Sequence, residues 1–135
     1  MSFESAIAAS ASGLHAQSLR MRVIAENLAN ADSVARTPGG APYRRRVATF
    51  APKLDRATGA MTVAVRSIIG DPGAFERSYD PGNPAADAAG YVLRPNVNSL
   101  IESADMKAAQ RSYEANLNAI EAARGMTMRT IDLIR

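Results

Sequence analysis

Large apolar residues recur at a helical period near both ends of the chain, but not in its middle. Four residues near the N-terminus lie seven positions apart: Ile7, Leu14, Met21 and Leu28. Residues near the C-terminus step by threes and fours: Met106, Ala109, Tyr113, Leu117, Ile120, Ala123, Thr127, Ile131 and Ile134. A mean spacing of about 3.5 residues is typical of helices that wind around partner helices. The pattern therefore predicts one helix over residues 4–31 and another over 99–135.

The residues between the two predicted helices favour short strands and turns instead. Residues 46–54 and 60–69 are predicted to form a β-hairpin, because 55–59 supplies turn-forming residues. In the second strand three apolar side chains alternate with smaller or polar ones and should be buried on one face: Met61, Val63 and Val65. Residues 91–93 favour a third short strand, and seven Gly and Pro residues in 70–90 predict an extended loop.

These elements predict a mainly α fold. Its long N- and C-terminal helices form a coiled-coil hairpin, with a small β-containing insert and an extended loop between them. Residues 1–32 and 98–135 would make a discontinuous terminal helical domain, and 33–97 the insert. A capping box, with Ser99 as N-cap and Glu102 returning to its backbone N–H, marks the start of the second helix. The pattern leaves open whether the terminal helices pair within one subunit or between subunits.

Composition points to a chain that needs neighbours. Only 26 of the 135 residues are Leu, Ile, Val or Phe, about 19%, which is just below the ~20% associated with disorder in highly charged chains. The net charge is only +3, so we expect a marginally stable chain whose missing buried area comes from neighbouring subunits. No apolar run approaches the ~18 residues of a membrane span, so no direct membrane insertion is expected. The N-terminus lacks the features of a cleavable secretory signal.

Charge is concentrated in the middle of the chain, where residues 33–97 carry +4. Residues 44–46 form the only basic run, three consecutive Arg, which is interpreted as a solvated or subunit-pairing strip. An Arg-rich nucleic-acid-binding module is the alternative, and it would need aromatic stacking platforms or a recognition helix. The seven Tyr and Phe residues are scattered, so no nucleic-acid partner is predicted.

The sequence contains no cluster of catalytic residue types. The chain has no Cys, and its single His, His15, is interpreted as a surface or interface residue with no acid within a turn. Four acids share the loop but lack the EF-hand pattern: Asp71, Glu76, Asp80 and Asp87. Phosphate-binding loops and nucleophile elbows are absent. The prediction is a protein that is not an enzyme and has no cofactor, metal or small-molecule substrate.

Polar residues occupy two places where a helix former would be the simpler choice. Asn27, Asn30 and Asp32 crowd the end of the first helix, and Tyr113 and Asn116 lie in the middle of the second. Polar groups inside a helical seam commonly fix its register at some loss of stability. The simpler interpretation of the first group is a helix stop, since Asn and Asp take over backbone hydrogen bonds. We favour a register-setting role at assembly interfaces.

Several segments, including these polar residues, resemble the axial proteins of the bacterial flagellum. Residues 25–33 (AENLANADS) resemble the N-terminal signature shared by rod and hook proteins. Within this group the chain most resembles the proximal rod proteins of the basal body, in four further segments: 37–45 (TPGGAPYRR), 90–92 (GYV), 95–98 (PNVN) and 111–116 (RSYEAN). It departs from them at 99–109, where a larger apolar, Met-bearing run is expected.

The resemblance implies a structural function. Proteins of this kind leave through the flagellar type III export apparatus without cleavage. They polymerise helically in the periplasm, and their terminal helices form the inner layer around the export channel of a torque-transmitting shaft. Expected partners are copies of the chain, other rod proteins, and ring and export-gate components. The alternative is a non-polymerising helical adaptor or an export-chaperone-like protein that binds other coiled coils.

Overall fold

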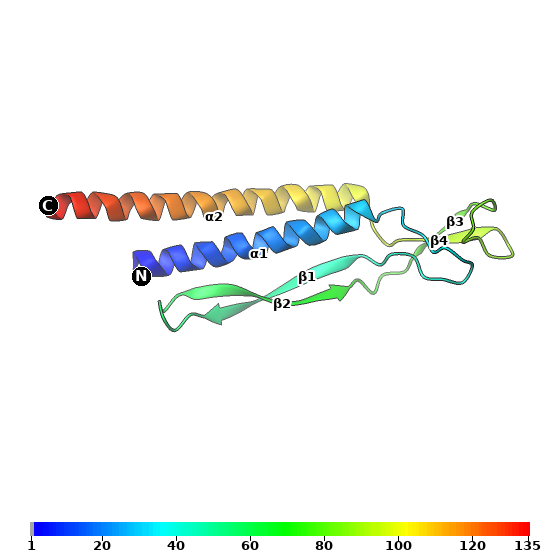
Figure 1. The fold of residues 1–135 in the computed structure, drawn as a ribbon, viewed down its shortest axis with the longest axis horizontal. Helices are drawn as coiled ribbons and strands as arrows, with labels where there is room; N and C mark the ends of the chain where they lie inside the picture. The colour runs from blue at the N-terminus through cyan, green and yellow to red at the C-terminus, as the bar shows by residue number, and fades with distance from the viewer. Residues whose placement is uncertain (1) are drawn as a thin grey trace. The chain divides into compact units, whose positions relative to one another are not determined.

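The computed structural model describes residues 2–135, which form two helices and four strands (Figure 1). In chain order these are α1 (Phe3–Ala29), β1 (Arg46–Leu54), β2 (Met61–Gly70), β3 (Glu76–Tyr79), β4 (Tyr91–Arg94) and α2 (Ser99–Ile134). The predicted helices, hairpin strands and third strand are confirmed with small shifts of their ends. Strand β3 was not predicted, and it turns part of the expected loop into a second hairpin.

Each pair of strands forms its own two-stranded antiparallel sheet. In the turn between β1 and β2, the Asp55 carboxylate accepts hydrogen bonds from the Ala57 N–H at 3.0 Å and the Thr58 hydroxyl at 2.9 Å. Gly59 completes this turn with a φ of +72°, which favours glycine. In the other sheet Tyr79 lies opposite Tyr91, and their rings meet edge to face at 5.3 Å.

The chain divides into two compact units, each built from both helices and the residues between them. The described part of unit 1 is 2–21, Ala48–Ser67 and Lys107–Arg135. Unit 2 is Arg22–Val47 and Ile68–Met106.

In unit 1, α1 lies between the β1–β2 hairpin and α2 (Figure 1). The Ser12 hydroxyl accepts a hydrogen bond from the backbone N–H of Val63 in β2 at 3.0 Å. On the α2 side, Gly13 faces Asn116, and a Cβ at Gly13 would lie only 2.6 Å from Asn116 Nδ2. The hairpin therefore contacts the helix directly.

This arrangement shows that the predicted fold class is wrong. The structure is 47% helix and 20% strand, so strands form a substantial part of the fold rather than a small insert in a coiled-coil hairpin. The heptad pattern correctly predicted the two helices. It did not show that β1 and β2 would lie along the first helix, because that contact depends on residues such as Ser12 and Val63, some 50 positions apart.

Small side chains occupy four of the eight buried positions described in the two helices. Ala16, Ala109 and Ala123 are buried, whereas each large residue of the N-terminal heptad is only half-buried. The hairpin follows the same trend. The β2 residues expected to be buried are exposed by 64%, 42% and 37%: Met61, Val63 and Val65. That expectation is wrong within this chain, which leaves much of its large apolar surface uncovered.

The predicted capping box at the start of α2 is also wrong. The Asn98 side chain, not Ser99, caps the helix: its Oδ1 accepts hydrogen bonds from the N–H groups of Leu100 at 3.0 Å and Ile101 at 3.3 Å. Glu102 is fully buried, and its carboxylate bonds to other parts of unit 2. The local pattern suited either cap, and the buried partners of Glu102 decided between them.

The two helix glycines provide a matched test of the contact between α1 and α2. Replacing Gly125 by Ala should stabilise the chain by about 0.5–1 kcal/mol, because Ala favours a helix and nothing lies within 4 Å of the new Cβ. Gly13→Ala should not stabilise the chain, because the new Cβ would clash with the Asn116 side chain. The gain should return in the double variant Gly13→Ala, Asn116→Ala. Urea unfolding measures all three, and an equal gain at Gly13 alone would contradict the contact.

Candidate functional site

A buried hydrogen-bonded cluster in unit 2 is centred on Asn27, near the end of α1. Its side-chain Nδ2 donates to the Arg46 carbonyl at 2.8 Å and to Glu102 Oε2 at 3.3 Å. Its Oδ1 accepts from the Tyr43 hydroxyl at 2.7 Å and from the Arg46 N–H at 2.9 Å. Both donors and both lone pairs of a side chain that is 1% exposed are therefore used. Asn27 thus joins the end of α1 to the start of β1 and to α2.

Glu102 and Arg45 form the charged half of this cluster, which we call the Asn27–Glu102 cluster. Arg45 Nε donates to Glu102 Oε1, and Arg45 Nη1 donates to Asp71 Oδ2 at 3.1 Å. Asp105 lies 3.6 Å from the same guanidinium. The hydrogen bond to Glu102 is the main cause that raises the pKa of Arg45. The Glu102 carboxylate is thus compensated by a cation and by the Asn27 amide, as a buried charge requires.

Backbone groups complete the cluster. The Asn96 Oδ1 accepts a hydrogen bond from the Arg45 N–H at 2.7 Å. The Gly73 N–H donates to the Asp71 carboxylate at 2.8 Å. This hydrogen bond is the main cause of the lowered pKa of Asp71, and the hydrogen bond from Arg45 is the second cause. Burial is the main cause that raises the pKa of Tyr43. Since each of these groups is held by its neighbours, the arrangement is suited to holding elements together rather than to acid–base chemistry.

The other predicted polar residues lie outside this cluster. Asn30 donates to the Glu26 carbonyl at 2.9 Å and accepts from the Ser33 hydroxyl at 3.0 Å, which ends the helix locally. Asp32 is exposed. In α2, Asn116 Nδ2 donates to the Ser112 carbonyl at 2.9 Å, so its side chain lies along the helix against Gly13. Tyr113 is half-buried.

The predicted apolar interface residues are not brought together into one core. Ile7, Leu14, Met21 and Leu28 are half-buried, and so is Ile120. Leu117 and Ile131 are exposed by 40% and 44%. Whether these residues form interfaces with other molecules stays a prediction.

Sequence reasoning missed the role of Arg45 and Glu102. The sequence predicts a solvated or subunit-pairing strip at Arg45 and a helix cap at Glu102. The unusual Asn27 was the one available signal, since a buried amide in a helix needs partners. Its partner Glu102 lies 75 positions away, so the local pattern could not identify it.

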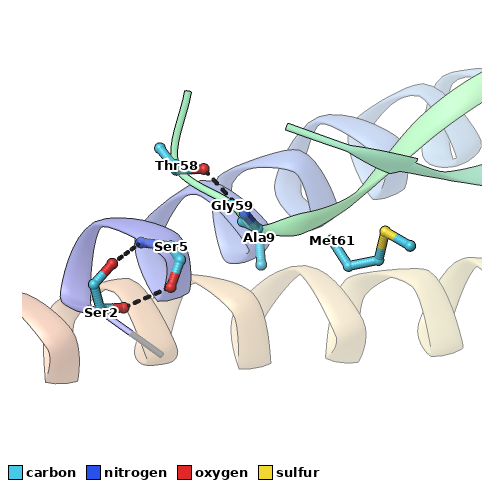
Figure 2. A pocket seen from close by; sticks show the side chains of 7 residues that line it. Ser2, Ser5, Ala9, Thr58, Gly59 and Met61 are labelled. Atoms are coloured by element: carbon cyan, nitrogen blue, oxygen red, sulfur yellow. Dashed lines mark hydrogen bonds between the residues drawn. The ribbon is translucent and has the colours of Figure 1, made fainter. Parts of the chain in front are cut away.

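A cavity of about 430 Å³ lies in unit 1 beside the start of α1 and the turn that precedes β2 (Figure 2). One wall contains Ser2, which precedes α1, and Ser5 and Ala9 of α1. The Ser5 hydroxyl donates to the Ser2 carbonyl at 2.8 Å, so it already bonds within the helix. The opposite wall, which includes Met61, contributes no titratable side chain. The cavity is thus a space for packing.

Two kinds of feature are absent from the described residues, 2–135. Neither helix in that range combines the length and apolar character needed to cross a membrane. The same residues bring together no group of three or more His, Cys, Asp or Glu side chains suited to a metal ion.

Comparison with known proteins gives a consistent result. Residues 7–36 match the family described as "Flagella basal body rod protein", and residues 88–133 match "Flagellar basal body rod FlgEFG protein C-terminal". The flagellar basal-body rod protein FlgC of Agrobacterium fabrum is 52% identical over 124 residues, covering 92% of this chain and 89% of the relative. The corresponding protein of Salmonella typhimurium is 44% identical, with 90% of each chain covered. That of Bacillus subtilis is 37% identical over 139 residues, with 92% and 93% covered.

Proposed function

Because the chain belongs to the FlgC family of flagellar basal-body rod proteins, and is a structural subunit of the basal-body rod, we propose that it polymerises helically through its two helices to form the proximal part of that rod. Its contribution would be stiffness from packing, which transmits torque and encloses the export channel, and it would catalyse no reaction. The relatives are structural proteins of the rod, which supports this proposal.

The apolar face of α1 carries the proposal. Buried Ser5 and Ala16 face the interior of unit 1. Ile7 follows Ser5 by two positions, and Leu14 precedes Ala16 by two. Each large side chain therefore points about 160–200° around the helix axis from its buried neighbour. The large side chains therefore lie on the side away from the chain's own core and are only half covered. A neighbouring helix on this face would supply the buried area that the isolated chain lacks.

In this proposal the seven-residue row on α1 and the C-terminal row on α2 are subunit contacts: Ile7, Leu14, Met21 and Leu28, with Leu117, Ile120 and Ile131. The polar residues Asn27, Asn30, Asp32, Tyr113 and Asn116 would set the register at which the helices engage. Within the chain, the contact of Asn116 with Gly13 and the buried bonds of Asn27 hold neighbouring elements in one alignment. The division into a terminal domain (1–32 and 98–135) and an insert (33–97) stays a prediction.

The chain is located in the flagellar basal body. We further propose that it lies in the periplasmic part of the rod and is exported without a cleavable signal peptide. Its partners would be copies of itself and other rod components, with ring and export-gate proteins at the base of the rod. The exposed apolar residues of both helices support several contacts for each subunit.

A deletion strain tests the proposal. Cells without this chain should not swim, and an epitope-tagged copy should restore swimming and copurify with basal bodies through the ring and rod fractions. A tagged copy that restores swimming but stays in the cytoplasm would contradict the proposal and favour a soluble adaptor. Sequencing the N-terminus of the assembled protein checks export, since a processed end would contradict export without cleavage.

A further inference from the structure

Ion pairs are confined to one of the two compact units. All five ion pairs found among residues 2–135 lie in unit 2. Three of them share Arg45, whose partners are Glu102, Asp71 and Asp105. The other two are surface pairs with side chains that are 45–60% exposed, and such pairs contribute little to stability. The charged bonding of unit 2 therefore depends on the Asn27–Glu102 cluster.

Unit 1 joins its distant segments with neutral groups instead. In its described part, the Ser12 hydroxyl accepts from the Val63 N–H at 3.0 Å, and the hydroxyls of Thr49 and Ser67 lie 2.8 Å apart. No carboxylate takes part in these bonds. A change of carboxylate charge should therefore leave the long-range hydrogen bonds of unit 1 in place.

Carboxylates connect four separate segments of unit 2. Glu102, near the start of α2, accepts from Arg45, just before β1, and from Asn27, near the end of α1. Asp71, just after β2, accepts from Arg45 at 3.1 Å. Loss of the negative charges would weaken these connections together. It would also leave a guanidinium whose side chain is only 23% exposed without a partner anion.

In acid, only the carboxyl groups of this cluster change their charge. The groups that face Glu102 and Asp71 from the neighbouring segments are Tyr43, Arg44, Arg45 and Asp105, and Glu26 and Arg46 lie close to Tyr43. Arginine keeps its charge throughout, and Tyr43 stays neutral because burial raises its pKa. The single histidine of the chain, His15, belongs to unit 1. Acid therefore removes negative charge from the cluster and changes nothing else in it.

We propose that unit 2 is an acid-releasable part of the chain: neutralising the carboxylates of the Asn27–Glu102 cluster frees the end of α1 and the start of α2, while the bonds within unit 1 persist. The confinement of the ion pairs to unit 2 and the burial of Glu102 carry this inference. It concerns the single chain, so it does not depend on the proposed helical assembly.

The direction of the effect follows from Asp71. The hydrogen bond from the Gly73 N–H, and then the one from Arg45, lower the pKa of this carboxyl in the folded chain. A carboxyl with a lowered pKa contributes stability above its pKa in the unfolded chain, about 3.9. That stability is lost as the pH falls through the lower pKa of the folded chain. Release of unit 2 is therefore expected below about pH 4.

Hydrogen exchange of the purified full-length chain, measured by mass spectrometry, tests the proposal. Protection factors, corrected for the intrinsic pH dependence of exchange, are compared at about pH 6 and about pH 2.5, on either side of the ordinary carboxyl range. Protection in 22–30 and 95–106 should fall at least about tenfold, and in 48–67 and 107–125 less than about threefold. Return to the higher pH should restore it. Parallel losses in both units, or full protection of unit 2 in acid, would overturn the proposal.

Neutral variants of the same shape show whether the cluster carboxylates cause the response. Glu102→Gln combined with Asp71→Asn should reduce the protection of unit 2 already near neutral pH and abolish most of its pH response. A full response in this double variant would contradict the proposal. Asp71→Asn alone keeps the buried Glu102–Arg45 pair and serves as the test if the double variant does not fold. Its response should be at least about threefold smaller than that of the unmodified chain, and an unchanged response would overturn the proposal.

Asp55 supplies the matched control in unit 1. The pKa of this carboxyl is also lowered, mainly by the hydrogen bond from the Thr58 hydroxyl, but its bonds stay within its own turn. Asp55→Asn should therefore leave the pH response of unit 2 unchanged. If it removed that response as fully as the change at Asp71 and Glu102, the acid effect would not arise from the cluster.

Discussion

Replacing Glu102 by Ala is expected to destabilise the folded chain by about 1–3 kcal/mol, because Asn27 and Arg45 both lose a buried hydrogen-bond partner while Arg45 keeps Asp71. The Glu102 side chain is 1% exposed and bonds to both Arg45 and Asn27. A chain with so few large apolar residues has a small free energy of unfolding, so the variant should be largely unfolded at 37 °C. Urea unfolding followed by circular dichroism measures the loss.

Two controls separate the buried pair from surface charge. Asp105→Ala removes a carboxylate that is 36% exposed and 3.6 Å from the same Arg45, and it should cost less than about 1 kcal/mol. Replacing Arg45 and Glu102 together by Met should cost less than Glu102→Ala alone, since no unpaired charge is then buried. If Glu102→Ala were as mild as Asp105→Ala, the cluster would not hold unit 2 together.

Leu28→Asp is expected to abolish swimming while the variant protein is still exported to the culture medium. Burying a side chain of this size against a neighbour is worth ~1.5–3 kcal/mol, and an unpaired charge in the seam increases the loss. The contact repeats in every subunit, so the effect is multiplied along the rod. Immunoblots of the medium and of purified basal bodies, with a swimming assay, measure both parts of the result.

His15→Asp provides the matched control on the same helix. His15 is exposed, so the new carboxylate should remain in water and the cells should continue to swim. Normal swimming of the Leu28→Asp strain would contradict the proposal that the apolar row of α1 forms subunit contacts. A variant that accumulates inside the cell would instead show that Leu28 is needed for export.

The sequence predicted the main elements because their signals are local. The seven-residue spacing from Ile7 to Leu28 and the turn residues 55–59 are each contained in a short window. Strand β3, with the sequence Glu-Arg-Ser-Tyr, has no apolar alternation and is defined by pairing with β4. Local patterns therefore could not reveal it.

The features that the sequence did not predict depend on hydrogen bonds between residues that are far apart in the sequence. Glu102 forms its bonds with Asn27 and Arg45, and Ser12 bonds to Val63. A local capping pattern explained Glu102 equally well until its burial was known. That the apolar pattern of α1 reflects a need for partners stays a prediction. Only the structure shows that Ala16 is buried in the chain's own core while Leu14 is half-buried.

Maleimide labelling of Leu14→Cys tests the central claim most directly. The large apolar side chains on the helices should be partly accessible in the free subunit and covered by neighbouring subunits in the rod. The rate is measured in purified subunits and in intact basal bodies of a swimming strain, with full labelling after denaturation as the reference. We expect labelling of the free subunit and at least about tenfold slower labelling in basal bodies. Equal rates in the two states would contradict it.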